Sequence, residues 1–463
     1  MKRLLKASKR HPEASAAALE CSAASPTFGF TFSNNSQGAS AAAAELSTAL
    51  GTALDQIDLD GDLGDRFKHL VDQLDQEASN YENSKIGKED TFNIWECRQG
   101  TAHLLSIAWK CALWSYDPAG DMLDTEYCRF RKDHVASASI GGTVKALSCT
   151  VVEPLSGRGT LNTFLPVLVI AVRGSASKMD HMVNANGRPR DANGFIDPSI
   201  SGHHDLLAHS GFLNSAEALE SIVSQSISRY AQKHTSGDIR VLFTGHSAGG
   251  AVASLLYLHY LSREDLRSSI RFSCITFGAP PSITAEVKSP GCNRLSSNNE
   301  SLCLNIINEF DLVSRADPPY ILSIVNIFRS MYGQPPLLPS DTNLGCDIPS
   351  QHPTAPPPSE PDSAARTFSH KAYLENEKSA AFAAKIWPVP RPLYYHVGKK
   401  VVLLMRLEED DVQMKAVQIL TPAFEKLLFC RVAVHSKICY SERIQLIEKG
   451  RFNGYDSWER RPH

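Results

Sequence analysis

The fold of this 463-residue chain is decided by the stretch IRVLFTGHSAGGAVASLLYLHYL, residues 239–261. An apolar strand is predicted before the central glycines and an apolar helix after them. Gly245 and Gly249 flank Ser247 with G-x-S-x-G spacing, and side chains at either glycine would strike the neighbouring helix and strand. The stretch therefore predicts a sharp strand-to-helix turn that holds Ser247 in a strained conformation at the carboxyl edge of a sheet.

Such a turn is a nucleophile elbow, which exposes a serine hydroxyl above the sheet. The amino end of the helix behind it stabilises negative charge. We therefore expect Ser247 to be a nucleophile. The alternative is a Ser-Gly-rich turn inside an ordinary strand-helix unit.

Apolar patterns on both sides of the elbow alternate between strand and helix. Helical spacing is seen over 102–116, 215–230 and 248–261. The predicted strands are 143–152, 165–172, 239–243, 270–277, 303–308 and 400–407. This alternation predicts an α/β fold with a mostly parallel central sheet and helices on both faces.

The composition is that of an ordinary globular protein, with 42% hydrophobic and 21% charged residues. The net charge of −3 provides no positive field, so nucleic acid is not an expected partner. The 11 cysteines show no C-x-x-C spacing, which favours buried thiols in a reducing compartment. With no signal peptide and no apolar run of ~18 residues, we expect a cytoplasmic protein.

Two regions differ in composition from the rest of the chain. Residues 1–85 begin with a low-complexity stretch rich in Ala, Ser and Asn, followed by helical spacing, and predict a separate, partly helical region. Residues 86–463 then form one domain. Within it, a stretch around 333–387 is rich in Pro, Ser and Asp and predicts a disordered surface insertion.

Four further blocks accompany the elbow in a characteristic order. They are Val-Arg-Gly-Ser at 172–175, Ala-His-Ser-Gly-Phe at 208–212, Thr-Phe-Gly-Ala-Pro at 276–280 and Ile-Asn-Glu-Phe-Asp-Leu-Val at 307–313. Together with the elbow, they resemble the class 3 (fungal-type) lipase family of the α/β-hydrolase superfamily. The resemblance covers roughly residues 96–447 and implies an α/β-hydrolase fold.

A nucleophilic serine needs a histidine base and a carboxylate that orients it, and in this fold the chain order is Ser, acid, His. Asp311 fits the acid because it follows the predicted strand 303–308 at its carboxyl end. Asp317 is the local rival, placed before Pro318 in a turn-like stretch.

Two histidines compete for the role of the base. His435 resembles the late family motif in which an aromatic residue follows the histidine, and we favour it. His396 resembles a family segment that is usually structural. His246 is adjacent to Ser247 and should point away from it, and His209 precedes the nucleophile and should pack beneath the site.

An oxyanion that forms during acyl transfer needs fixed hydrogen-bond donors. The backbone N–H of Ala248, directly after the nucleophile, is one candidate. The resemblance of residues 172–175 to the family's oxyanion segment implies Ser175 as the second. The alternative is that this segment is a turn that closes a strand.

The resemblance implies a serine-dependent carboxylic ester hydrolase that acts on a lipid or acylglycerol, with peripheral membrane contact and no metal or organic cofactor. Two departures from the family stand out: Ala248 replaces the usual leucine, and residues 179–198, where the lid is expected, are polar. A polar lid argues against long-chain triglyceride as substrate. A catalytically silent scaffold protein and an acyltransferase are the alternative functions, and the sequence does not specify the oligomeric state.

Overall fold

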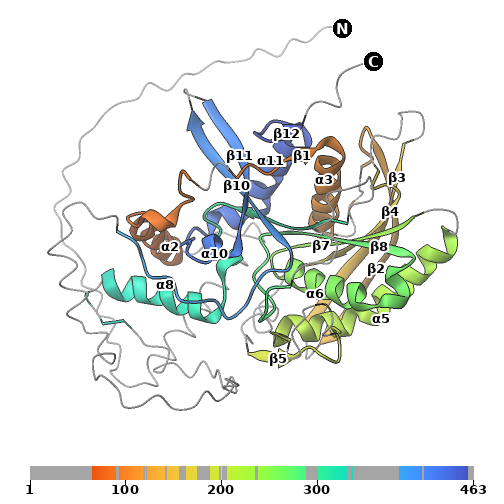
Figure 1. Cartoon of the computed structure of the whole chain (residues 1–463), viewed down its shortest axis with the longest axis horizontal. Helices are drawn as coiled ribbons and strands as arrows, with labels where there is room; N and C mark the ends of the chain where they lie inside the picture. The colour runs from red at the N-terminus through yellow and green to blue at the C-terminus, as the bar shows by residue number, and fades with distance from the viewer. Residues whose placement is uncertain are drawn as a thin grey trace, which may run out of the picture.

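A computed structural model of the chain describes a central α/β unit (Figure 1). The described residues are 65–89, 93–117, 120, 123–140, 143–155, 163–174, 188–197, 200, 206–234, 238–287, 301–331, 333, 335–336, 385–408 and 411–456. The low-complexity stretch within 1–85 and Ser175 lie outside these residues.

The described residues build an eight-stranded sheet with the order β11-β10-β9-β8-β7-β4-β3-β2. Its strands are β2 (Cys128–Ile140), β3 (Thr143–Pro154), β4 (Val167–Val172), β7 (Ile239–His246), β8 (Ile270–Phe277), β9 (Cys303–Asn308), β10 (Lys399–Glu408) and β11 (Asp411–Ile419). Strands β4, β7, β8, β9 and β10 run parallel to their neighbours in the centre. The outer pairs β2–β3, β3–β4 and β10–β11 are antiparallel.

The remaining elements are helices and short strand pairs. The helices are α2 (Asp65–Ala78), α3 (Gln99–Trp114), α5 (Ser210–Lys233), α6 (Ala248–Ser262), α7 (Glu264–Arg267), α8 (Pro318–Met331), α10 (Thr421–Phe424) and α11 (Lys437–Glu448). The 3-10 turns are η1 (Glu82–Ser84), η4 (Val313–Arg315) and η6 (Ala433–His435). The short strands β1 (Cys97–Arg98) and β12 (Tyr455–Asp456) pair with each other, as do β5 (Pro189–Asp191) and β6 (Leu207–His209).

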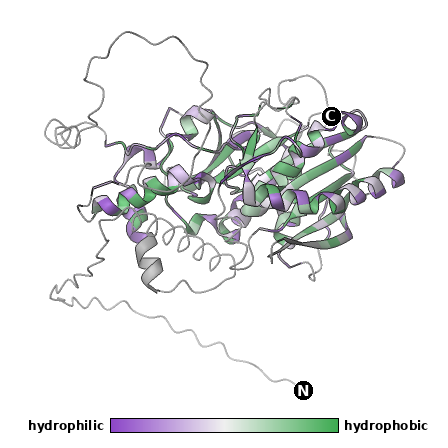
Figure 2. Ribbon diagram, turned by 90° about the horizontal axis from the view of Figure 1, so that it is seen from below, coloured by the Kyte–Doolittle hydropathy of each residue, from purple (hydrophilic) through white to green (hydrophobic). Residues whose placement is uncertain are grey.

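Helices cover both faces of the sheet, because its central strands are apolar on both sides. On one face, α5 and α6 bury Leu219 and Leu255 against Ile170. On the other, α3 and α11 bury Leu105 and Ile444 in a second core with the alternate strand residues. Figure 2 shows the hydrophobic strands enclosed between helices whose outer faces are hydrophilic. The prediction of an α/β fold with a mostly parallel sheet is confirmed.

Several elements were not predicted from the sequence. Strands β2 and β11 interrupt their apolar pattern with polar and charged residues, which their places at the two edges of the sheet allow. Helix α8 begins with Pro318, in a stretch expected to be a turn, and proline is well tolerated in the first turn of a helix. Helix α5 begins at Ser210, five residues before the predicted start.

Residues before the predicted domain boundary at residue 85 pack against the globular unit. Leu74, Ala78 and Tyr81 are buried in one cluster with residues of α8 such as Ile324. Helices α2 and α8 lie side by side in Figure 1. Residues 74–81 therefore share a core with α8, and the boundary at residue 85 stays a prediction.

One end of the predicted Pro-rich insertion packs in the core. Most of the stretch lies outside the described residues, but its last residue, Trp387, is only 5% exposed. The Trp387 indole N–H donates to Ser323 Oγ at 2.8 Å, and its ring meets Tyr81 edge-on with centroids 5.1 Å apart. The chain therefore rejoins the core before residue 387.

Replacing Trp387 tests this anchor. Trp387→Ala should lower the free energy of unfolding by about 3–5 kcal/mol, since it removes a large buried ring and leaves Ser323 without this donor. The neighbouring Ile386 is 64% exposed, so Ile386→Ala is the matched control and should change stability by less than about 0.5 kcal/mol. Urea unfolding curves measure both, and equal effects of the two substitutions would contradict the anchor.

Candidate active site

Ser247 stands at the turn between β7 and α6 with φ 57° and ψ −136°. A non-glycine residue with positive φ is strained, and such strain marks functional sites. A Cβ atom at Gly245 would stand 2.5 Å from the Gly249 carbonyl carbon, and one at Gly249 would stand 2.2 Å from the Val172 carbonyl oxygen. The two glycines thus let the elbow close against β4, as the spacing predicted.

The end of β4 packs directly on the elbow helix. The same added Cβ at Gly249 would lie 2.7 Å from the amide nitrogen of Gly174, in the predicted oxyanion segment. Ala248 is the first residue of α6, so its N–H belongs to the group that has no partner within the helix. The segment that leads into Ser175 and the Ala248 N–H therefore meet beside Ser247.

Asp311 and His435 meet in the interior of the protein. His435 Nδ1 lies 3.0 Å from Asp311 Oδ2, and both side chains have no exposed surface. The other carboxylate oxygen, Oδ1, accepts the Val313 N–H at 3.0 Å. With Oδ2 as the acceptor, Nδ1 of a neutral His435 carries the proton, and Nε2 is the basic nitrogen.

Gly278, directly after β8, locates this pair relative to the serine. Its φ is 55°, and an added Cβ would lie 2.8 Å from Asp311 Oδ2 and 2.9 Å from His435 Cε1. The residue before it, Phe277, accepts the Ser247 backbone N–H at 2.9 Å. The structure thus brings Ser247, Asp311 and His435 around the ends of β7 and β8.

Asp311 and His435 are 124 positions apart, and hydrogen bonds between the two segments close this gap. Asp311 and Arg431 form a parallel bridge, in which the Arg431 N–H donates to the Phe310 carbonyl at 2.9 Å. The Asn308 side-chain amide donates to the Val434 carbonyl at 2.7 Å. The segment that ends in His435 is therefore fixed to the loop that presents the acid.

Tyr440 is a further residue of the site, which the sequence analysis did not assign. Its hydroxyl donates to Asp311 Oδ2 at 2.7 Å and accepts the Asn308 N–H at 3.0 Å. Burial, together with the negative charge of Asp311, raises the pKa of Tyr440 well above its ordinary value. Tyr440 is the aromatic residue that follows His435, and this motif was the available signal.

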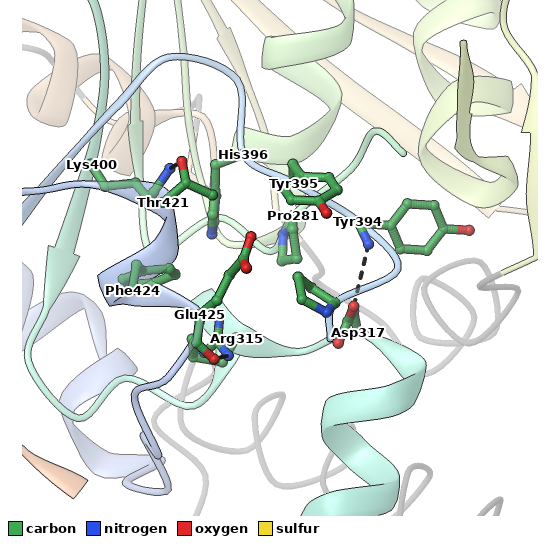
Figure 3. Close-up of a pocket in the computed structure, with 11 residues that line it drawn as sticks. Pro281, Arg315, Asp317, Tyr394, Tyr395, His396, Lys400, Thr421, Phe424 and Glu425 are labelled. Atoms are coloured by element: carbon green, nitrogen blue, oxygen red, sulfur yellow. Dashed lines mark hydrogen bonds between the residues drawn. The ribbon is translucent and has the colours of Figure 1, made fainter. Parts of the chain in front are cut away.

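His396 lies apart from the acid. Its Nε2 donates to the Ser314 carbonyl at 2.8 Å, and burial lowers its pKa to about 3, assisted by the charge of Lys400. Figure 3 shows it in a recess with Lys400 and Phe424, whose lining does not include the serine or His435. This geometry is that of a neutral core histidine.

Asp317 and His209 make structural contacts. Asp317 accepts backbone N–H groups from Tyr320, Leu393 and Tyr394, the last of which is drawn in Figure 3. The His209 ring stacks on Phe212 with centroids 4.1 Å apart. Asp317 therefore anchors the chain near residue 393 to the start of α8, and His209 packs at the start of α5.

Two further properties concern only the described residues. Among them, no group of three or more His, Cys, Asp or Glu side chains is arranged to hold a metal ion. No helix in these parts of the chain is long and apolar enough to cross a membrane.

The sheet order, the parallel centre and the strained serine between β7 and α6 define an α/β-hydrolase fold. The sequence model of the family described as Lipase (class 3) matches residues 169–320. This range contains Ser247 and Asp311 and ends before His435. Residues 169–320 therefore match the class 3 lipase family, in agreement with the resemblance seen in the motifs.

A curated relative is phospholipase A1 PLIP1, chloroplastic, of Arabidopsis thaliana, 32% identical over 90 residues. The match covers 19% of this chain and 14% of the relative's length. Among solved structures, the native Rhizomucor miehei lipase propeptide complex shares 21% identity over 48% of this chain and 65% of its own, with a TM-score of 0.33. Nonglycosylated Yarrowia lipolytica LIP2 lipase shares 15% identity over 47% of this chain and 75% of its own, with a TM-score of 0.35.

The buried, neutral His396 makes stability depend on pH. Its pKa is about 3 in the folded chain and 6.5 in a model peptide, so the unfolded state binds the proton more tightly. The contribution of His396 to the free energy of unfolding is therefore complete above about pH 6.5. It is lost as the pH falls toward 3, at roughly 1.4 kcal/mol per pH unit.

Between pH 7 and pH 5, wild type should lose about 2 kcal/mol more than His396→Gln, which keeps an amide donor for the Ser314 carbonyl but does not titrate. Urea unfolding at the two pH values measures the difference. Equal losses in the two proteins would show that His396 is not held neutral by burial.

Proposed function

We propose that this protein is a carboxylic ester hydrolase that acts on lipid esters, with Ser247 as nucleophile, His435 as base and Asp311 as acid. One observation carries this proposal: a fully buried Asp311–His435 hydrogen bond forms across 124 positions of sequence, beside a strained serine in a class 3 lipase segment. Buried carboxylate–histidine pairs can be purely structural, but this one lies beside a positive-φ serine at an elbow.

In the first step, Ser247 Oγ attacks the carbonyl carbon of the ester while its proton passes to His435 Nε2. The π electrons of the carbonyl move onto its oxygen and form a tetrahedral oxyanion. The positive charge on the imidazolium is stabilised by Asp311, to which the Nδ1–H of His435 donates throughout.

In the second step, the bond to the alcohol breaks and His435 returns the proton to the departing oxygen, leaving an acyl-serine. A water molecule then repeats the sequence: His435 takes its proton, the hydroxide attacks the acyl carbon, and the carboxylic acid leaves with Ser247 restored. Each half-reaction uses the same base twice, so no external acid is required.

We propose Ala248 and Ser175 as the oxyanion donors. The Ala248 N–H lies at the amino end of α6, where the helix dipole also favours negative charge. Ser175 follows Gly174, which packs against the elbow. Loss of one such donor typically costs about 100- to 1000-fold in kcat.

For the substrate, we propose a lipid with a polar head group, which the protein reaches by peripheral contact with a membrane surface. The relative named a phospholipase A1 and the polar sequence of residues 179–198 support this choice over triglyceride. The two other candidate functions are less favoured: a silent scaffold would not need the buried Asp311–His435 pair, and acyl transfer would need an acceptor other than water.

Ser247→Ala should abolish hydrolysis of a short soluble ester, with a fall in kcat on the order of a millionfold. It should also abolish covalent labelling by a fluorophosphonate probe, because no oxygen remains to attack phosphorus. Ester turnover and mass spectrometry of the labelled protein measure the two effects.

Ser254→Ala is the matched control, since Ser254 lies on the same helix and is buried, with its hydroxyl bonded to the Ala251 carbonyl. It should retain activity and labelling at Ser247. Residual wild-type turnover in Ser247→Ala would place the nucleophile elsewhere.

The same assay should distinguish the roles of His435 and His396. His435→Ala should reduce kcat nearly as much as Ser247→Ala, and combining the two should add little, because residues that act as one unit fail together. His396→Ala should lower the free energy of unfolding and leave kcat of the folded fraction within a few-fold of wild type. The opposite ranking in kcat would assign the base to His396.

A further inference from the structure

A second histidine lies directly behind the proposed base. The ring of His246 packs on the ring of His435 with centroids 4.6 Å apart and 25° between the planes. His246 Nε2 lies 3.0 Å from the backbone carbonyl oxygen of His435, and the His246 side chain is fully buried. The side chain next to the serine therefore points away from it, as the sequence predicted, yet contacts the base.

The partners of His246 determine where its proton lies. A carbonyl oxygen can only accept, so Nε2 is the donor to His435. Burial, reinforced by the nearby His435, holds the pKa of His246 well below its ordinary value, so the ring is neutral and Nδ1 accepts. The Tyr116 hydroxyl, 3.1 Å from Nδ1, is then the donor.

The same hydroxyl lies against the predicted oxyanion segment. A Cβ atom at Gly174 would stand 2.0 Å from Tyr116 Oη and 2.7 Å from the His246 carbonyl oxygen. The backbone before Ser175 therefore rests on Tyr116 and on the backbone of His246. One hydrogen-bonded chain runs from beneath the oxyanion segment, through Tyr116 and His246, to the backbone of the base.

Neighbouring aromatic rings fix the orientation of His246. Trp109 meets it edge-on with centroids 5.6 Å apart and an interplanar angle of 86°, and Tyr440 meets it at 5.5 Å and 67°. Lys437 Nζ lies over the Tyr116 ring, 4.4 Å from its centre. Packing therefore holds the side chains of His246 and Tyr116, the two donors of this hydrogen-bonded chain, in single orientations.

We propose that Tyr116 and His246 are positioning residues. Together they fix the position of the backbone of the base relative to the oxyanion segment. This inference rests on the proposed function of Ser247 and His435. Neither residue touches the reacting atoms. A neutral His246 also adds no positive charge beside the imidazolium that forms on His435 during the reaction.

The test compares two replacements of His246. His246→Leu removes the donor to the His435 carbonyl, whereas His246→Gln places an amide N–H near the position of Nε2. Because displacement of a catalytic group by about 1 Å can cost 100-fold in rate, His246→Leu should lower kcat on a short soluble ester by roughly 10- to 100-fold. KM should stay within about twofold, since the substrate contacts are intact, and His246→Gln should recover most of kcat.

Fluorophosphonate labelling of Ser247 gives a second readout. The labelling rate should be highest in wild type, lower in His246→Gln and lowest in His246→Leu. Tyr116→Phe removes a single oxygen and should lower kcat several-fold, so it carries the test if His246→Leu does not fold. His259→Leu is the matched control: its Nδ1 also bonds a backbone carbonyl, that of Phe195, and its loss should leave kcat unchanged.

The outcomes separate this inference from the proposed function. A wild-type protein without ester turnover or labelling would remove the proposed function. An active wild type in which His246→Leu and Tyr116→Phe keep full kcat would overturn the positioning role alone. Equal loss in His246→Leu and His246→Gln, or a loss confined to KM, would also overturn it.

Discussion

The hydrogen bond between Asp311 and His435 constrains much of this structure, because both side chains are completely buried. A buried carboxylate that loses its partner typically destabilises a protein by about 3–5 kcal/mol, so the two segments must meet whenever the chain folds. Strand β9 leads into Asp311, and β10 and β11 carry the chain out to one edge of the sheet before it returns through Arg431. The late part of the sheet thus brings His435 back to Asp311.

The sequence predicted the centre of the fold well, because parallel strands covered on both faces are continuous apolar runs with no competing interpretation. The edge strands β2 and β11 were missed, since one partner and partial exposure allow charged residues there. Local motifs identified Ser247, Asp311 and His435 as candidates. Tyr440 and His246 acquire their contacts only through tertiary packing, 132 and 189 positions from their partners.

Two buried histidines in this protein share one geometry and differ in position. His246 and His396 each direct Nε2 at a backbone carbonyl, and burial lowers the pKa of both. The partner of His396 is Ser314, and its surroundings are the recess of Figure 3. The partner of His246 is the backbone of His435, the proposed base. The same neutral donor can therefore support a loop or a proposed catalytic residue, and its neighbours decide which.

The anchoring of Trp387 has a consequence for protein engineering. Trp387 shares two hydrogen bonds with the side-chain amide of Asn83 and one with Ser323 of α8, and Arg329 of the same helix bonds the Pro335 carbonyl. Both ends of the segment between residues 336 and 385 are thus attached around a single helix. Closing a longer loop costs only about 0.6 kcal/mol per doubling of its length. A fluorescent protein or a binding tag inserted there would therefore be attached to the globular unit at both ends, beside α8.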